Sequence, residues 1–449
     1  MSKKNQYLSL IFFSILLSFP IKVLSSINDN IESLNTLSFN SIEYDERFLD
    51  EELYSEFLRE YIFSQPEFAY ATAIQNEKSL LLRGARRERF PTLSGRVVND
   101  EILDRKIDDY SSLRKRQDDS FDVVAEINQP LYLGGRINSQ IRFAEHEAKG
   151  ANIDKKLTTS RLVLEANETF LYAMIYYHLH KYSLELLEGL EPYREKMGSR
   201  VQSGAIDPVE HAVFSARLNK FQSTIFALEA RSKTSIANFE NTFRISFEFL
   251  GFPKIGISMD SEISKNDSFG LLFKESQYFA SLENVNVTKS DYMPKLGVQA
   301  RYTKYDIDQS SNESDIRGGI YLSFPIFDFG RGRAKINASK AKARSAQVEI
   351  DIEKKSNDVK ENELITIIES SYKANEKLKD IFQDTKKQRT IIRDRILLSG
   401  FSPITLIEAS ENELIQLQIL LESEYKLLAS YYSLLHQNRF LLNQLKLKI

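Results

Sequence analysis

Residues 129–136 read Gln-Pro-Leu-Tyr-Leu-Gly-Gly-Arg, and a related stretch, Phe-Pro-Ile-Phe-Asp-Phe-Gly-Arg, occupies residues 324–331. Each follows a run of alternating apolar and polar residues, and each precedes a long helical pattern. Proline fits the end of a strand because it donates no ladder hydrogen bond, and glycine lets the chain turn without a Cβ penalty. Both stretches therefore predict a corner where a strand becomes a helix. The corner residues are Pro130, Gly134, Gly135, Pro325, Gly330 and Gly332.

The two corners belong to an internal repeat. Pro130 and Pro325 are 195 residues apart, and so are Pro208 and Pro403, each of which closes a Ser-Gly turn. Chance pairs of prolines would not keep one offset over so long an interval. We therefore expect a mixed, mainly α protein with a duplicated α-β-β-α-α architecture rather than two unrelated domains.

The repeat divides the chain into expected segments. They are a signal peptide over 1–25, an N-terminal extension with a short helix over 26–64, a first repeat over 65–250, a linker over 251–268 and a second repeat over 269–449. The expected hairpins cover 93–131 and 295–325, and the expected long helices cover 136–249 and 331–445.

Alternation with a period of two predicts the strands. In the second strand Phe121, Val123, Ala125 and Ile127 alternate with Asp122, Val124, Glu126 and Asn128. Strands of about ten residues are long enough to cross a bilayer when tilted. The half-buried hairpin of a water-soluble protein would alternate in the same way, so the pattern alone leaves both interpretations open.

Two long helical patterns follow the corners. The interval from Gly135 to Gly204 is 69 residues and that from Gly330 to Gly400 is 70, roughly 100 Å as helix. Pro192 is expected to kink the first helix. The shorter expected helices, 208–249 with 268–291 and 403–445 with 66–89, total 66 and 67 residues. These similar lengths predict a cylinder of antiparallel coiled coils.

The N-terminus has the pattern of an export signal. Lys3 and Lys4 precede the apolar run Leu8–Phe19, and cleavage is expected near Ser26. The alternative, a permanent anchor, is disfavoured because the run is shorter than the ~20 residues of a spanning helix.

The composition of the 449-residue chain excludes several kinds of site and function. The chain has no cysteine, which excludes disulfides, thiolate metal sites and a lipidated cysteine, and its net charge of −3 gives no case for nucleic-acid binding. All five histidines fall in helical patterns, and His178 and His180 point to different helix faces. Glu411 and Glu413 lie among basic residues, as on a solvated coiled-coil face. We expect no enzyme activity, no metal and no cofactor.

In its repeated motifs the chain resembles the TolC-like outer-membrane factors of bacterial efflux and type I secretion. The resemblance covers about Leu53 to Ile449 and rests on six motifs that keep their register. They are the Pro-x-Leu sites at Pro91 and Pro294, the two corners, and the turns 204–208 and 400–403.

The resemblance implies a homotrimer with a shared 12-stranded β-barrel in the outer membrane and an α-helical tunnel across the periplasm. It implies a periplasmic adaptor (membrane-fusion protein), an inner-membrane ABC or RND transporter and outer-membrane lipid as partners. Cargo is either secreted protein or small molecules, and residues 129–136 look somewhat more like the secretion-associated branch. The alternative is a periplasmic coiled-coil scaffold or adaptor without a membrane barrel.

The resemblance also implies a periplasmic tip and a gate. The tip turns would contain Gly204, Asp207, Pro208, Gly400 and Pro403. Glu408 would ring the lumen as the gate, with Thr405 where an aspartate is common in the family. An ordinary solvated Glu408 on the outer helix face is the competing interpretation. Asp207 is more simply a helix N-cap.

Overall fold

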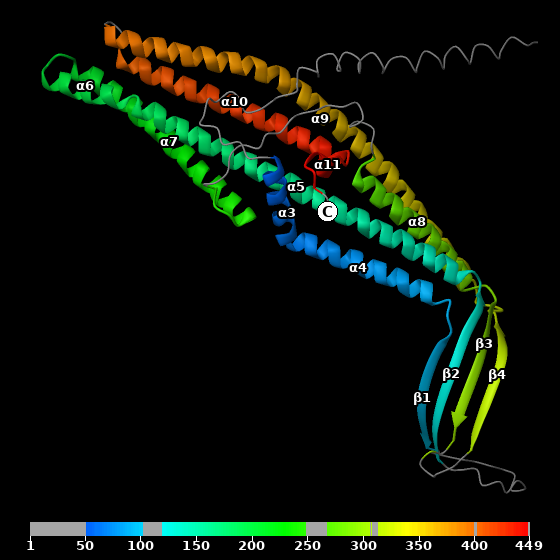
Figure 1. The fold of residues 1–449 in the computed structure, drawn as a ribbon. Helices are drawn as coiled ribbons and strands as arrows, with labels where there is room; N and C mark the ends of the chain where they lie inside the picture. The colour runs from blue at the N-terminus through cyan, green and yellow to red at the C-terminus, as the bar shows by residue number, and fades with distance from the viewer. Residues whose placement is uncertain are drawn as a thin grey trace, which may run out of the picture. The chain divides into compact units, whose positions relative to one another are not determined.

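The computed structural model describes residues 51–101, 119–247, 267–305, 307, 313–398 and 402–447 (Figure 1). The expected signal peptide, Gly400 and most of the expected linker lie outside these residues. The chain is mainly helical and divides into two compact units. One comprises residues 1–68, 157–268 and 356–449, and the other comprises 69–156 and 269–355. We call them the helical unit and the sheet unit.

The sheet unit holds one antiparallel sheet in the order β1-β2-β3-β4 (Figure 1). Its strands are β1 Thr92–Glu101, β2 Asp119–Leu133, β3 Lys295–Lys304 and β4 Ser314–Ser323. Both predicted hairpins are present, since β1 pairs with β2 and β3 with β4. The first hairpin extends two residues past its expected end at residue 131, because a bulge between Pro130 and Tyr132 lets β2 continue to pair with β3 as far as Leu133.

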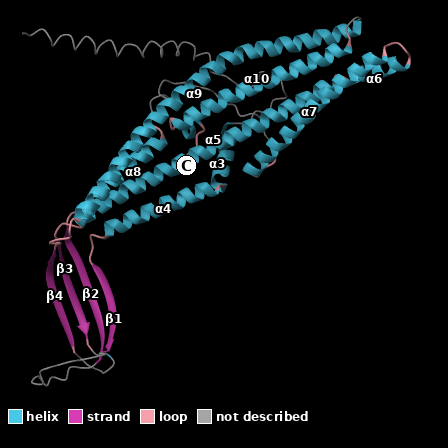
Figure 2. Cartoon of the chain, turned by 180° about the vertical axis from the view of Figure 1, so that it is seen from behind, coloured by secondary structure: helices cyan, strands magenta, loops and turns pink. Residues whose placement is uncertain are grey.

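Four helical segments of the same unit follow the strand order (Figure 2). They come from α4 Pro66–Arg87, the first part of α5 Arg136–Glu188, α8 Phe269–Ser290 and the first part of α9 Arg331–Leu398. Ion pairs join neighbours: Arg86 of α4 to Glu145 of α5, Arg142 of α5 to Glu283 of α8, and Lys274 of α8 to Glu349 of α9. Each strand thus leads to or from one helix, and α4 and α9 are the outer helices.

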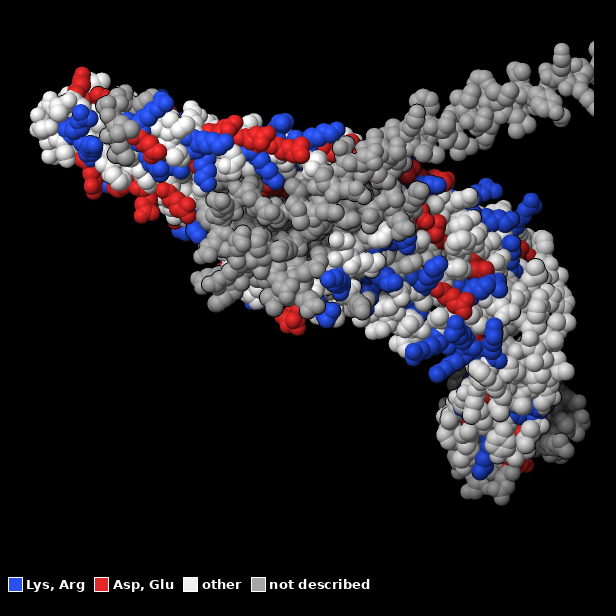
Figure 3. Space-filling model, turned by 45° about the horizontal axis from the view of Figure 1, so that its top comes forward, with Lys and Arg blue, Asp and Glu red and all other residues white. Residues whose placement is uncertain are grey.

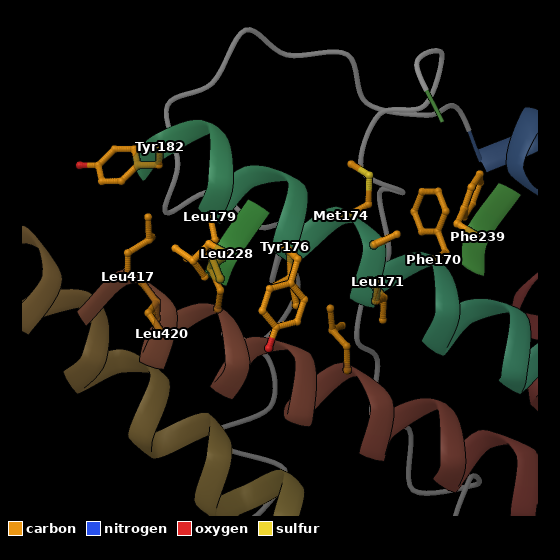
Figure 4. Close-up of a cluster of buried hydrophobic side chains, with 14 of the residues drawn as sticks. Phe170, Leu171, Met174, Tyr176, Leu179, Tyr182, Leu228, Phe239, Leu417 and Leu420 are labelled. Atoms are coloured by element: carbon orange, nitrogen blue, oxygen red, sulfur yellow. The ribbon is translucent and has the colours of Figure 1, made fainter. Parts of the chain in front are cut away.

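The helical unit is built around an apolar core. It contains α3 Glu51–Ser64, α6 Glu191–Gln202, α7 Pro208–Phe243, α10 Pro403–Gln437 and α11 Leu441–Gln444, with the later parts of α5 and α9. Figure 4 shows Phe170 and Leu179 of α5 among side chains from α7 and α10. Both are fully buried. Every third or fourth residue of these helices contributes to the core, as an antiparallel coiled-coil arrangement requires.

The first long helix is interrupted at Gly189 and Leu190, beside Pro192 as expected, because proline cannot donate a hydrogen bond to the preceding turn. Two other helices end earlier than predicted. α7 ends at Phe243, where Arg244 turns left-handed with φ of 59°. Likewise, α10 ends at Gln437 rather than near 445.

The predicted match between two short helices and one long helix is therefore wrong. α7 and α8 together have 58 residues, and α10 and α4 together have 57, against 68 in α9. The unbroken helix predicted after Gly330 is confirmed as α9.

Candidate functional site

One face of the sheet is apolar and exposed. Residues paired across neighbouring strands lie on the same face, so the register defines its members. The exposed large apolar side chains on it are Leu93, Val97, Ile127, Tyr132, Val298, Tyr302, Ile316, Ile320 and Leu322. Ile316 is 79% and Ile320 74% exposed. A contiguous apolar surface spanning four strands marks contact with a lipid or protein partner rather than with water.

The opposite face of the sheet is polar and internally paired. Arg301 of β3 lies 3.0 Å from the carboxylate of Glu126 on β2. Tyr321 of β4 passes over Gly297 and donates a hydrogen bond of 3.1 Å to Asn128 of β2. A Cβ on Gly297 would lie 2.4 Å from the Tyr321 hydroxyl oxygen, so the glycine makes this crossing possible. The two faces suit different solvents.

Both edges of the sheet are open within the described residues. β1 pairs only with β2, and β4 pairs only with β3. Each edge strand therefore presents a row of backbone N–H and C=O groups that another strand can pair. Unpaired groups of this kind are unfavourable in hydrocarbon, where no water is present to satisfy them.

The corners are built from left-handed residues. In the first, Gly134 and Gly135 have φ of 63° and 84°. In the second, Phe329 has φ of 54° and Gly330 has 84°. Glycine adopts this region without strain, so Gly135 and Gly330 turn the chain into α5 and α9.

Asp328 fixes the start of α9 in the second corner. Its carboxylate accepts hydrogen bonds from the backbone N–H of Gly330 at 3.0 Å and of Gly332 at 2.5 Å. Gly332 lies inside the helix, and a Cβ there would lie 2.4 Å from the Tyr292 ring. Gly332 therefore permits the close approach of Tyr292, which lies in the turn between α8 and β3. Pro325 lies in the irregular segment after β4.

The helices that follow the two hairpin turns, α7 and α10, begin with the same kind of N-cap. Gly204 is left-handed, with φ of 69°. The carboxylate of Asp207 accepts a hydrogen bond of 2.8 Å from the N–H of Val209, so Asp207 is the N-cap of α7, and Pro208 is its first residue. Ser402 caps α10 in the same way, ahead of Pro403.

The predicted gate residue Glu408 is ion-paired. Its carboxylate lies 3.3 Å from the guanidinium of Arg217 on α7. One turn farther, Glu411 lies 2.8 Å from Lys220 of α7. The hydroxyl of Thr405 is hydrogen-bonded within its own helical turn, since it donates a hydrogen bond of 2.6 Å to the carbonyl of Ser402. The charge of Glu408 is therefore balanced within one chain.

A buried carboxylate escaped the sequence analysis. Glu413, expected on a solvated face, is fully buried. It accepts hydrogen bonds from Tyr182 of α5 and, at 2.5 Å, from Arg389 of α9, so it ties three helices together. Its spacing could have indicated this, because Glu413 falls on the buried face of α10, between Ser410 and Leu417 at helical spacing.

No described helix is long and apolar enough to cross a membrane.

Comparisons with known proteins place the fold. No protein-family model and no curated protein sequence matches the chain. The outer membrane channel CmeC of Campylobacter jejuni is 14% identical over 91% of this chain and 91% of that chain, with a TM-score of 0.74. The open-state outer membrane channel MtrE of Neisseria gonorrhoeae is 13% identical over 86% and 89%, with a TM-score of 0.72.

A third solved structure agrees with these two. The outer membrane protein VceC of Vibrio cholerae is 13% identical over 87% of this chain and 95% of that chain, with a TM-score of 0.71. CmeC and MtrE are described as outer membrane channels and VceC as an outer membrane protein. At such identities the likeness establishes the fold.

Proposed function

Because the chain has the TolC-like fold of outer-membrane channels, we propose that it forms the outer-membrane channel of an export system. The observation that carries the proposal is the two-sided sheet, apolar and exposed on one face and polar on the other. Lipid on one side and water on the other is the situation of a membrane β-barrel wall. Strands β1, β3 and β4 have ten residues each, which suits a tilted crossing of ~30 Å of hydrocarbon.

The open edges support an oligomer. Four strands do not close a membrane barrel, for which about eight are the minimum. We infer that three copies share one barrel of twelve strands, as the family resemblance implies, with β4 of one copy paired to β1 of the next. The outer helices also carry exposed apolar side chains along their length: Tyr70, Leu80 and Leu81 on α4, and Val348 and Ile352 on α9.

We place the helical hairpin turns at a periplasmic tip, where an adaptor and an inner-membrane ABC or RND transporter would dock. Within that tip, Glu408 is the proposed gate, held by Arg217. Single-channel conductance tests this assignment. Glu408→Gln should lower cation selectivity and Arg217→Gln should raise it, because the second change leaves the carboxylate uncompensated. Unchanged selectivity in both variants would reject the gate.

Fractionation tests the channel itself. We expect the protein in outer membranes as an oligomer that resists SDS until heated. Recovery from the soluble periplasm without detergent would instead favour the periplasmic scaffold. Cargo, whether secreted protein or small molecules, follows from the transporter, so co-purification of the transporter and adaptor decides between type I secretion and efflux.

A further inference from the structure

The outer helix α9 starts with an unbalanced basic segment. Its first eighteen residues, 331–348, contain six cations and no acid: Arg331, Arg333, Lys335, Lys340, Lys342 and Arg344. All six are exposed, and none forms an ion pair with a described residue. Cations in the first turn of a helix also oppose the helix dipole. The segment therefore carries uncompensated positive charge in the isolated chain, and an external anion would neutralise it.

The other outer helix, α4, ends in a second basic segment. Arg83, Arg86, Arg87 and Arg89 lie within seven residues, all exposed, with Glu88 as the only acid among them. Arg86 is paired with Glu145 and Arg89 donates a hydrogen bond to Asn138. Neither Arg83 nor Arg87 has an ion-pair partner in the described part of the chain. Figure 3 shows a dense group of Lys and Arg side chains where the helices approach the strands.

The two basic segments adjoin the two open edges of one sheet. α4 leads into the edge strand β1, and the edge strand β4 leads into α9. If β4 of one copy pairs with β1 of the next, the cations of α9 and α4 come together at the junction between copies. Like charges would repel there unless an anion lies among them.

Exposed phenylalanines identify the kind of anion. Phe90 lies between α4 and β1, and Phe327 and Phe329 lie between β4 and α9; they are 65%, 75% and 91% exposed. Along the chain the order is therefore apolar strand, exposed aromatic and cation. That is the order of hydrocarbon, interface and headgroup in a bilayer, where aromatic side chains gather at the interface. A free anion or an acidic peptide would leave these rings uncovered.

We propose that the assembled channel binds the phosphate headgroups of anionic phospholipids with a basic collar formed by residues 331–335 of one copy and 83–89 of the next. The inference rests on the proposed function. Basic segments beside a membrane attract anionic lipid strongly. The collar neutralises the junction between copies and sets the depth of the barrel in the bilayer.

Native mass spectrometry of the detergent-purified oligomer, with phosphatidylglycerol or phosphatidylcholine of equal chain length, tests the collar. We expect preferential binding of phosphatidylglycerol that millimolar inorganic phosphate does not displace. The triple variant Arg331→Gln/Arg333→Gln/Lys335→Gln should bind it ~10-fold more weakly. The matched control Lys354→Gln/Lys360→Gln/Lys373→Gln removes three exposed cations from the same helix outside the collar. It should bind phosphatidylglycerol as the unchanged protein does.

Equal binding of the two lipids, equal losses in the triple variant and its control, or displacement by phosphate would overturn the collar. If the triple variant does not assemble, Arg83→Gln/Arg87→Gln tests the other half and should also weaken phosphatidylglycerol binding. Failure of the unchanged protein to form an oligomer would refute the channel, whereas an oligomer without lipid preference would refute the collar alone.

Discussion

The helical unit and the sheet unit use the same residue types in opposite ways. In the helical unit the largest aromatic side chains, among them Phe170, Phe239 and Tyr431, are fully buried. In the sheet unit the largest apolar side chains of the strands point outward, and its small core cluster is formed by Ala85, Ile141 and Ala144. A protein folded for water alone would not keep both patterns. The helical unit therefore buries its apolar side chains within the chain, whereas the strands of the sheet unit leave theirs for an external partner.

Truncating one apolar residue in each unit should give the largest difference in stability between the two units. Phe239→Ala removes a fully buried ring from the helical unit and should cost about 3–5 kcal/mol. Ile320→Ala removes an exposed side chain and leaves no cavity. Thermal unfolding of the detergent-solubilised protein, followed by helical circular dichroism, should show a lower midpoint for Phe239→Ala only. Equal midpoints in the two variants would show that the buried ring of Phe239 contributes no more to stability than the exposed side chain of Ile320.

Charge insertion compares the two faces of the sheet. Ile320→Arg puts a cation on the apolar face and should disfavour membrane insertion by about 2–4 kcal/mol if the residue lies near the bilayer centre. Gln299→Arg, on the polar face, is the matched control, because Gln299 pairs with Gly319. Insertion into lipid vesicles after refolding measures the difference. If both variants insert equally well, the apolar face does not contact lipid.

Acid should weaken the helical unit through His178. Burial, followed by the nearby Lys181 charge, lowers the pKa of His178 to about 4 from 6.5. The unfolded chain therefore takes up the proton first, and stability falls as pH drops from 6.5 towards 4. Between pH 7 and 5 the loss should be on the order of 2 kcal/mol.

The variant His178→Leu isolates this contribution. Burial also lowers the pKa of His436, so part of the acid sensitivity should remain after the substitution. The midpoint of helical unfolding should change less with pH in His178→Leu than in the unchanged protein. An identical pH dependence would show that His178 does not titrate on unfolding in this range.

The corners, where the pattern changes from period two to helical, should respond more mildly. A β-branched residue at a left-handed position is strained by about 1–2 kcal/mol. Gly330→Val should therefore reduce the yield of heat-resistant oligomer, and Gly135→Val should do the same. Gly84→Val is the control, because a Cβ at Gly84 also meets nothing within 4 Å but Gly84 lies in α4 without a positive φ. Equal yields from all three variants would show that the left-handed backbone at Gly135 and Gly330 is not needed for assembly.

Local signals predicted the elements that depend on nearby residues. The alternation around Ile127 predicted a strand, and Asp207 followed by Pro208 predicted a helix start, because each involves only its own segment. The end of α7 at Phe243 was missed, since the left-handed Arg244 carries no such signal. The burial of Glu413 was missed because it depends on Tyr182, 231 residues away.

We expect copies of the chain to pair through their open sheet edges, β4 of one copy with β1 of the next. Since the chain has no cysteine, paired substitutions report this contact directly. Val97→Cys on β1 would be combined in turn with Ile316→Cys, Gly318→Cys or Ile320→Cys on β4, all on the apolar face. In outer membranes under oxidising conditions, one combination should give covalent dimers and trimers and nothing larger, because a disulfide requires Cα atoms within ~7 Å. Monomers alone in every combination would contradict the shared barrel.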